Sequence, residues 1–274
     1  MVNMGNVWDR TTEFLSDNAR ALLPIALFAM LIPHAINALV GRAGNTVHPL
    51  AASLIGLACV LAALWGQIAV VALALDPAGG RARAVGAATA SYGRALLAML
   101  FVLVVLCVLA LPILGVFAAS GADLSALRNG GMAHADLSGA ATTFVVIYFL
   151  ALIVLAIVAT IRLVLLYPVI VAEGGVIRAI QRSAALTGGI FWKTLGVWLL
   201  FTVVYLVASM AVTSALGVVV GLFSPLARPF SAGSIIVAIL SGIVTTVFTL
   251  VVAAFSAKLY QAARGAREGA AAAA

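Results

Sequence analysis

The segment Arg162–Leu195 has the sequence RLVLLYPVIVAEGGVIRAIQRSAALTGGIFWKTL. An apolar run ends at Pro168, and a break with two glycines follows it. Arg178 and Arg182 are four residues apart, so they share one face of a short helix over 176–187 whose other face is apolar. A second apolar run begins after the pair Trp-Lys. This order is typical of a chain that leaves a bilayer, runs along its surface as an amphipathic helix and enters the bilayer again.

The composition of the whole chain agrees with a lipid environment. Hydrophobic residues make up 65% of the 274 residues, and charged residues make up only 8%. A soluble domain carries about 25% charged residues, so this chain has too little polar surface to cover itself in water. The formal charge is +7, but the basic residues are spread over the ends of apolar runs. We therefore expect anionic lipid headgroups as partners, a membrane protein as an alternative partner, and no nucleic acid.

Six apolar runs are long enough to cross a bilayer as helices, at 21–40, 51–75, 95–118, 140–168, 194–222 and 233–256. The predicted fold class is all-α, a polytopic transmembrane bundle of six spans with short interfacial helices. We expect a single transmembrane domain over 1–274, with an interfacial helix (1–20), a first hairpin (21–75), an interfacial segment plus second hairpin (76–168), an interfacial helix plus third hairpin (169–256) and a cytoplasmic tail (257–274).

The basic residues predict the orientation. With six spans both termini lie on the same side, and short cytoplasmic loops carry the excess of Lys and Arg. Eleven basic residues flank the spans on the side of the termini, against three on the other side, Arg42, Arg128 and Arg228. Both termini are therefore expected in the cytoplasm. The abundance of Arg, Ala and Gly is typical of a GC-rich bacterial genome, so the expected location is a bacterial inner membrane.

Motifs of catalysis are missing from the sequence, including HExxH, GxSxG, GxGxxG, CxxC and a P-loop. We expect no enzyme activity, no cofactor and no metal. His134 with Asp123 and Asp136 is an alternative metal cluster in the longest polar loop, although a solvated loop accounts for these residues. Gln67 is an amide in the middle of the second span, where it is expected to hydrogen-bond a neighbouring helix, with a place on a transport path as the alternative.

The candidate residues for binding a lipid headgroup or a partner are Arg162, Glu173, Arg178, Arg182 and Lys193. The alternative for the two arginines of 176–187 is an interfacial helix that only fixes topology. Arg162 lies inside the fourth span, about 9 Å along the helix from Pro168. Its guanidinium either reaches the headgroup level or, if the chain folds back at the glycines, brackets a small polar pocket with Glu173.

Several pairs in the central segment form a recognisable pattern: Ala172-Glu173-Gly174, Ala179-Ile180, Arg182-Ser183, Leu186-Thr187 and Trp192-Lys193. In these pairs the chain resembles bacterial six-span proteins of the glycerophosphoryl diester phosphodiesterase membrane domain and their YciC-like relatives. The resemblance covers the last third of the chain by motif, and the first two thirds by hydropathy and loop order. It implies an inner-membrane protein. It does not imply phosphodiesterase activity, because catalysis in such enzymes belongs to a separate soluble barrel, for which the six spans are expected to leave no room.

Two functions are compatible with these features. We expect a non-enzymatic inner-membrane protein that acts through anionic lipid headgroups or as an accessory subunit of a membrane complex. The alternative is a transporter or permease for a lipid-like or small amphipathic substrate. Transporters usually carry charges near the middle of the bilayer. Here Arg162 is the one such residue and lies near the end of its span, which favours the first function.

Overall fold

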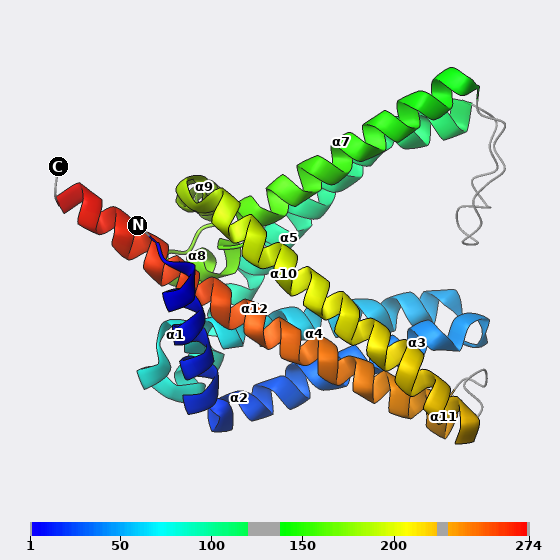
Figure 1. Ribbon diagram of the computed structural model, residues 1–274, viewed down its shortest axis with the longest axis horizontal. Coiled ribbons are helices and arrows are strands. Elements are labelled where there is room, and N and C mark those ends of the chain that lie inside the picture. The colour runs from blue at the N-terminus through cyan, green and yellow to red at the C-terminus, as the bar shows by residue number, and fades with distance from the viewer. Residues whose placement is uncertain (1, 120–137, 224–229, 273–274) are drawn as a thin grey trace.

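The computed structural model describes residues 2–119, 138–223 and 230–272, which form helices and short connections with no strand among them (Figure 1). The helices are α1 (Met4–Asp17), α2 (Ala19–Ile25), η1 (Ala26–Leu31), α3 (Ile32–Ala43), η2 (Gly44–Thr46), α4 (Pro49–Leu75), η3 (Pro77–Gly79), α5 (Gly80–Ala119), α7 (Gly139–Leu163), α8 (Leu166–Ala172), α9 (Ile177–Thr187), η4 (Gly188–Ile190), α10 (Phe191–Met210), η5 (Ala211–Leu216), α11 (Gly217–Phe223) and α12 (Ala232–Ala272).

Six segments of the described chain are long and apolar enough to cross a membrane: Ala19–Ala43, Pro49–Leu75, Pro77–Ala119, Gly139–Ala172, Ile177–Ser214 and Ala232–Gly269. The all-helical fold with six candidate spans is therefore confirmed, and the six apolar helices indicate a multi-pass membrane protein.

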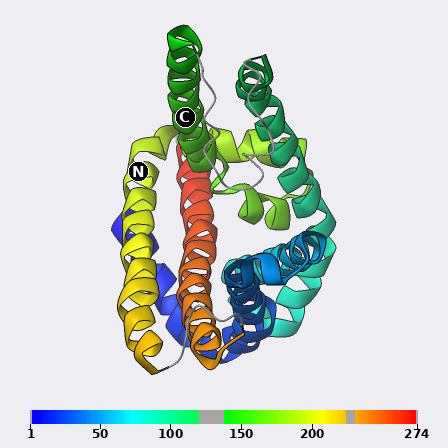
Figure 2. The ribbon, with the colours of Figure 1, turned by 90° about the vertical axis from the view of Figure 1, so that its right-hand side faces the viewer.

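Two short amphipathic helices, α1 and α9, cross the direction of the long helices (Figures 1 and 2). Asn3 caps the start of helix α1, because its side chain accepts a hydrogen bond from the N–H of Gly5 at 3.0 Å. The helix buries Val7, Thr11 and Phe14, which are spaced three or four residues apart on one face. This periodicity explains why the polar residues between them stay at the surface.

The segment 81–94 differs from the expected separate interfacial helix, because it continues without a break into the third span as the 40-residue α5. Its buried residues are small and recur every three or four positions: Ala84, Ala88, Ser91, Ala95 and Ala98. This stripe of small side chains lets α5 pack against α4 along its first half. A single apolar stripe gives the chain no reason to break at residue 94.

The fourth span is divided where the sequence predicts one helix over 140–168. Helix α7 ends at Leu163, and α8 begins at Leu166. Pro168 has no N–H to donate, and its ring would clash with the carbonyl of Val164 four residues before it. The break at Val164 follows from that clash, and it turns α8 into the protein interior, where Val169 and Ile170 are buried.

One region of the molecule, which we call the packed end, consists of α1, α8, the last part of α4 and residues 253–263 of α12. The run Ile68–Ala74 of α4 is buried throughout. Lys258 donates to the carbonyl of Ala74 at 2.8 Å, and Gln261 donates to the carbonyl of Leu75 at 3.1 Å. The last carbonyls of a helix have no partner within it and favour a cation, so α12 closes the end of α4.

A second region, which we call the open end, consists of residues 101–119 of α5 together with α7. Figures 1 and 2 show this hairpin diverging from the α3–α4 pair and from the α10–α12 pair. Most of its large apolar side chains are exposed, and Ile161 is the one buried residue of α7. In a bilayer, lipid chains would cover these side chains.

Candidate functional site

Glu173 lies at the packed end, in the turn that joins α8 to α9. Gly174 and Gly175 follow it with φ of 73° and 74°, a left-handed conformation that glycine adopts without strain and that reverses the chain here. The carboxylate Oε1 of Glu173 accepts a hydrogen bond from the hydroxyl of Tyr260 at 2.8 Å and one from Nε of Arg182 at 3.4 Å. The structure thus brings together two of the predicted site residues, Glu173 and Arg182.

Arg162 has different partners. Its Nη1 donates to the carbonyl of Ala184 at 2.9 Å, and its guanidinium lies 5.7 Å from the ring centre of Phe191. The carbonyl of Arg162 accepts from the hydroxyl of Ser183 at 2.7 Å. Ala184 is in the last turn of α9, where a carbonyl favours a cation. Arg162 therefore fastens α7 to α9, and the ion pairs of the described residues do not join it to Glu173.

Arg178 and Lys193 are both exposed: Arg178 lies near the start of α9, and Lys193 lies at the start of α10. Arg178 is exposed and makes no hydrogen bond or ion pair with the described part of the chain. Lys193 donates to the carbonyl of Val2 at 3.4 Å and lines an open cleft of about 780 Å³ between the start of α1 and the start of α10. Trp192, beside it, is 79% exposed. This aromatic-basic pair has the character of residues that sit at a membrane surface.

Two residues of the site were missed by sequence reasoning. Tyr260 is 2% exposed and supplies the closest partner of Glu173 from a position 87 residues later in the chain. Arg94 reaches the same turn, since a Cβ on Gly174 would lie 2.6 Å from its Nη1. The cluster of polar residues at the end of the sixth span is the signal that could have indicated Tyr260, but no periodicity connects it to Glu173.

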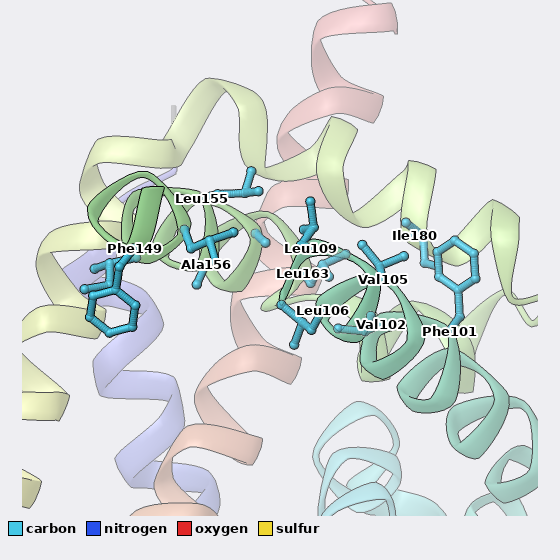
Figure 3. Close-up of a pocket in the computed structure, with 13 residues that line it drawn as sticks. Phe101, Val102, Val105, Leu106, Leu109, Phe149, Leu155, Ala156, Leu163 and Ile180 are labelled. Atoms are coloured by element: carbon cyan, nitrogen blue, oxygen red, sulfur yellow. The ribbon is translucent and has the colours of Figure 1, made fainter. Parts of the chain in front are cut away.

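A second group of polar side chains lies among the spans, around Gln67. Three cavities of about 290, 560 and 320 Å³ adjoin one another there, and Gln67 lines all three. The expected hydrogen bond from Gln67 to a neighbouring helix is not made with any described residue. A fourth cavity of about 390 Å³, between α5 and α7, has wholly apolar walls that include Phe101, Leu106 and Ile180 (Figure 3).

The alternative metal cluster cannot be placed, because His134, Asp123 and Asp136 lie outside the described residues.

No curated protein and no solved structure matches the chain. A family model described as "Domain of unknown function (DUF7847)" matches residues 5–263, which is most of the sequence. The chain therefore belongs to the DUF7847 family.

Proposed function

We propose that this protein is a non-enzymatic membrane protein that binds anionic lipid headgroups at the surface formed by α9 and the start of α10, by itself or as an accessory subunit of a membrane complex. The observation that supports it is Arg178, an exposed cation left without a partner in the described chain on an amphipathic helix. Each basic residue near an anionic surface contributes about 1 kcal/mol to binding. Arg178, Arg182 and Lys193 lie on one continuous stretch of chain around this surface.

The anchoring of α9 supports the same proposal. Its buried face carries Ala179, Ser183 and Leu186, and Arg162 and Ser183 tie it to α7. The polar face is therefore held in one orientation. A cation that is already positioned loses less entropy on binding a phosphate than a cation on a free chain.

The orientation of the protein is part of this proposal. We propose that both termini and α9 face the cytoplasm of a bacterium, because the excess of Arg and Lys flanks the spans on that side. We further propose that the family is related to the glycerophosphoryl diester phosphodiesterase membrane domain and its YciC-like relatives. Three features support this relation: the span that ends near Pro168, the Glu173-Gly174 turn and the Trp192-Lys193 entry into the next span.

The test measures the lipid that stays bound to Arg178→Gln. The full-length protein is purified in detergent with phosphatidylglycerol and examined by native mass spectrometry. Losing one surface cation should lower the affinity for phosphatidylglycerol by about fivefold. Arg178→Lys keeps the charge and should retain the lipid. Arg42 lies in the last turn of α3, on the side of the membrane that is predicted to be opposite to α9. Arg42→Gln is therefore the matched control and should behave like the wild type. Equal retention by Arg178→Gln and the wild type would refute headgroup binding at α9.

A second candidate function is transport of a lipid-like or small amphipathic substrate. The observation that favours it is the set of adjoining cavities around Gln67 at membrane depth. Polar groups inside a membrane commonly mark a substrate path. Saturable uptake of a labelled lipid into liposomes that contain the protein, reduced in Gln67→Leu, would support transport, and uptake equal to that of protein-free liposomes would exclude it.

A further inference from the structure

The position of Gln67 is fixed by the residue before it. At Gly66 a Cβ would lie 2.8 Å from Cγ of Met30 and 2.9 Å from Cβ of Ala29, so α4 is in close contact with the π-helical segment η1. Successive residues of an α-helix point about 100° apart. With Gly66 held against η1, the side chain of Gln67 points to another side, where the three cavities meet.

Gln67 is not the only polar group at these cavities without a partner. Tyr167 and Trp198 also line them, and neither the hydroxyl of Tyr167 nor the indole N–H of Trp198 hydrogen-bonds any residue in the described ranges. Gln67 is about 12 Å along α4 from its end at Leu75, which places the group inside the apolar layer. Polar groups at this depth need a hydrogen-bond partner. Because no described residue supplies one here, the partner is a molecule bound in the cavities.

The lining of the cavities limits what that molecule is. Among the described residues, no Asp, Glu, Lys or Arg lines any of the three. His34 lines one of them, but its Nδ1 is hydrogen-bonded to the hydroxyl of Thr246 at 3.2 Å, so the cavities offer a charged headgroup no carboxylate, ammonium or guanidinium as counter-ion. The amide of Gln67 both donates and accepts hydrogen bonds, the hydroxyl of Tyr167 does the same, and Trp198 donates only. These groups suit an uncharged molecule that carries both a hydroxyl and carbonyl oxygens.

The shape of the cavities indicates that this molecule also carries an apolar tail. The cavity of about 320 Å³ that Gln67 lines shares wall residues with the wholly apolar cavity of about 390 Å³ between α5 and α7: Val102, Leu106, Ala156, Ala159 and Leu163. A polar chamber and an apolar groove thus adjoin, and the groove lies on the hairpin of the open end (Figure 3). An acyl chain fits the groove, because its walls carry no polar side chain to be desolvated.

We infer that the protein binds an uncharged lipid bearing hydroxyl and carbonyl groups, with its head at Gln67, Tyr167 and Trp198 and its chain between α5 and α7. This site names a substrate class for the transport candidate, and it needs neither transport nor headgroup binding at α9 to be correct. Water alone in the polar chamber is the competing occupant.

The test uses full-length protein in phosphatidylcholine nanodiscs, with Trp8, Trp65 and Trp192 replaced by Phe so that Trp198 is the single emitter. Dioleoylglycerol with brominated chains is added as the quencher. A site gives quenching that saturates at a low mole fraction of this lipid, whereas random contact in the bilayer gives quenching that rises in proportion to it. Gln67→Leu should weaken binding by about fivefold to tenfold, which corresponds to the loss of one or two hydrogen bonds. Thr213→Val, which removes a hydroxyl in η5 that donates to the carbonyl of Ser209, is the control and should change nothing.

Further measurements keep the outcome decisive. If the Trp-to-Phe variant does not fold, native mass spectrometry of the wild type and Gln67→Leu with unlabelled dioleoylglycerol replaces it. Brominated phosphatidylglycerol should quench only in proportion to its amount, and saturation with it would overturn the uncharged class. Proportional quenching by the glyceride, or equal affinity in Gln67→Leu, would leave water as the occupant and overturn the site. Arg178→Gln should leave glyceride binding intact, which separates this result from that at α9.

Discussion

Helix α4 buries the whole run Ile68–Ala74 at the packed end, whereas α7, 25 residues long and described throughout, buries only Ile161 at the open end. Polar groups follow the same division. At the packed end, Glu173 accepts a hydrogen bond from Tyr260, and Lys258 donates one to a carbonyl at the end of α4. Around Gln67, between the two ends, the side chains of Gln67, Tyr167 and Trp198 have no hydrogen-bond partner in the described chain. The packed end therefore holds itself together, while the open end and its cavities depend on surrounding lipid.

This contrast also separates the proposed functions. The headgroup surface of α9 adjoins the packed end, where hydrogen bonds within the protein hold the side chains in place. The proposed lipid site has its polar head between the two ends, at Gln67, Tyr167 and Trp198, and its apolar groove on the hairpin of the open end, which diverges from the remaining helices. Substitutions at the packed end should change stability in any amphiphile, and substitutions at the open end should change lipid binding more than stability.

The largest expected effect is on the free energy of unfolding when a large side chain is removed from each end. Leu73 is 0% exposed and Leu155 is 46% exposed. Leu73→Ala leaves a cavity that the packed end cannot fill and should cost about 2–4 kcal/mol. Leu155→Ala removes a side chain that is exposed at the protein surface and should cost less than about 0.5 kcal/mol. Thermal unfolding in one detergent compares the two variants, and similar losses would abolish the distinction between the ends.

The next effect concerns the contact that positions Gln67. The added Cβ of Gly66→Ala pushes Met30 and Ala29 away from α4, which should lower the free energy of unfolding by about 1–3 kcal/mol. Gly93→Ala is the matched control, since no heavy atom lies within 4 Å of a Cβ added at this helical position. It should be neutral or stabilising by up to about 1 kcal/mol. A destabilised Gly93→Ala with an unchanged Gly66→Ala would mean that α4 and η1 are not packed as described.

A double-mutant cycle tests the bonds of Glu173. Tyr260→Phe and Glu173→Ala should couple by about 1 kcal/mol, because each removes the same charge-assisted hydrogen bond. The cycle of Arg162→Ala and Glu173→Ala should instead be additive within about 0.5 kcal/mol, since the two residues have separate partners. Coupling in the second cycle would show that Arg162 and Glu173 share a pocket after all.

The smallest effect is a pH dependence at Asp76. A hydrogen bond from Arg83 and one from the N–H of Gly79 hold the pKa of this carboxyl below its ordinary value. A depressed pKa in the folded state stabilises the protein above the unfolded pKa, and the contribution is lost as the pH falls through the folded value. The unfolding temperature of the wild type should therefore fall with acidification. The unfolding temperature of Asp76→Asn should fall less between about pH 5 and pH 2. The same decrease of the unfolding temperature in both proteins would show that the ionisation of Asp76 does not contribute to stability.

The sequence was sufficient for the elements that depend on local composition. Apolar runs located six spans, and four-residue spacing located α9 with its two arginines. It was insufficient where tertiary packing decides. The stripe of small residues that joins 81–94 to α5 has meaning only against α4. The bond from Tyr260 to Glu173 crosses 87 positions. Gln67 was expected to join two helices, but the partner that a polar residue finds depends on how far the neighbouring hairpins diverge.

The central claim, that the packed end with α9 lies on the cytoplasmic side, is tested most directly by labelling single cysteines with a membrane-impermeant thiol reagent. The background variant carries Cys59→Ala and Cys107→Ala. Ala78, Ala266 and Thr46 are all exposed, so each can report on its side of the membrane. In intact cells with a permeable outer envelope, a cysteine at Thr46 should react, and cysteines at Ala78 and Ala266 should react only after lysis. Labelling of Ala78 and Ala266 in intact cells, with Thr46 protected, would contradict the account.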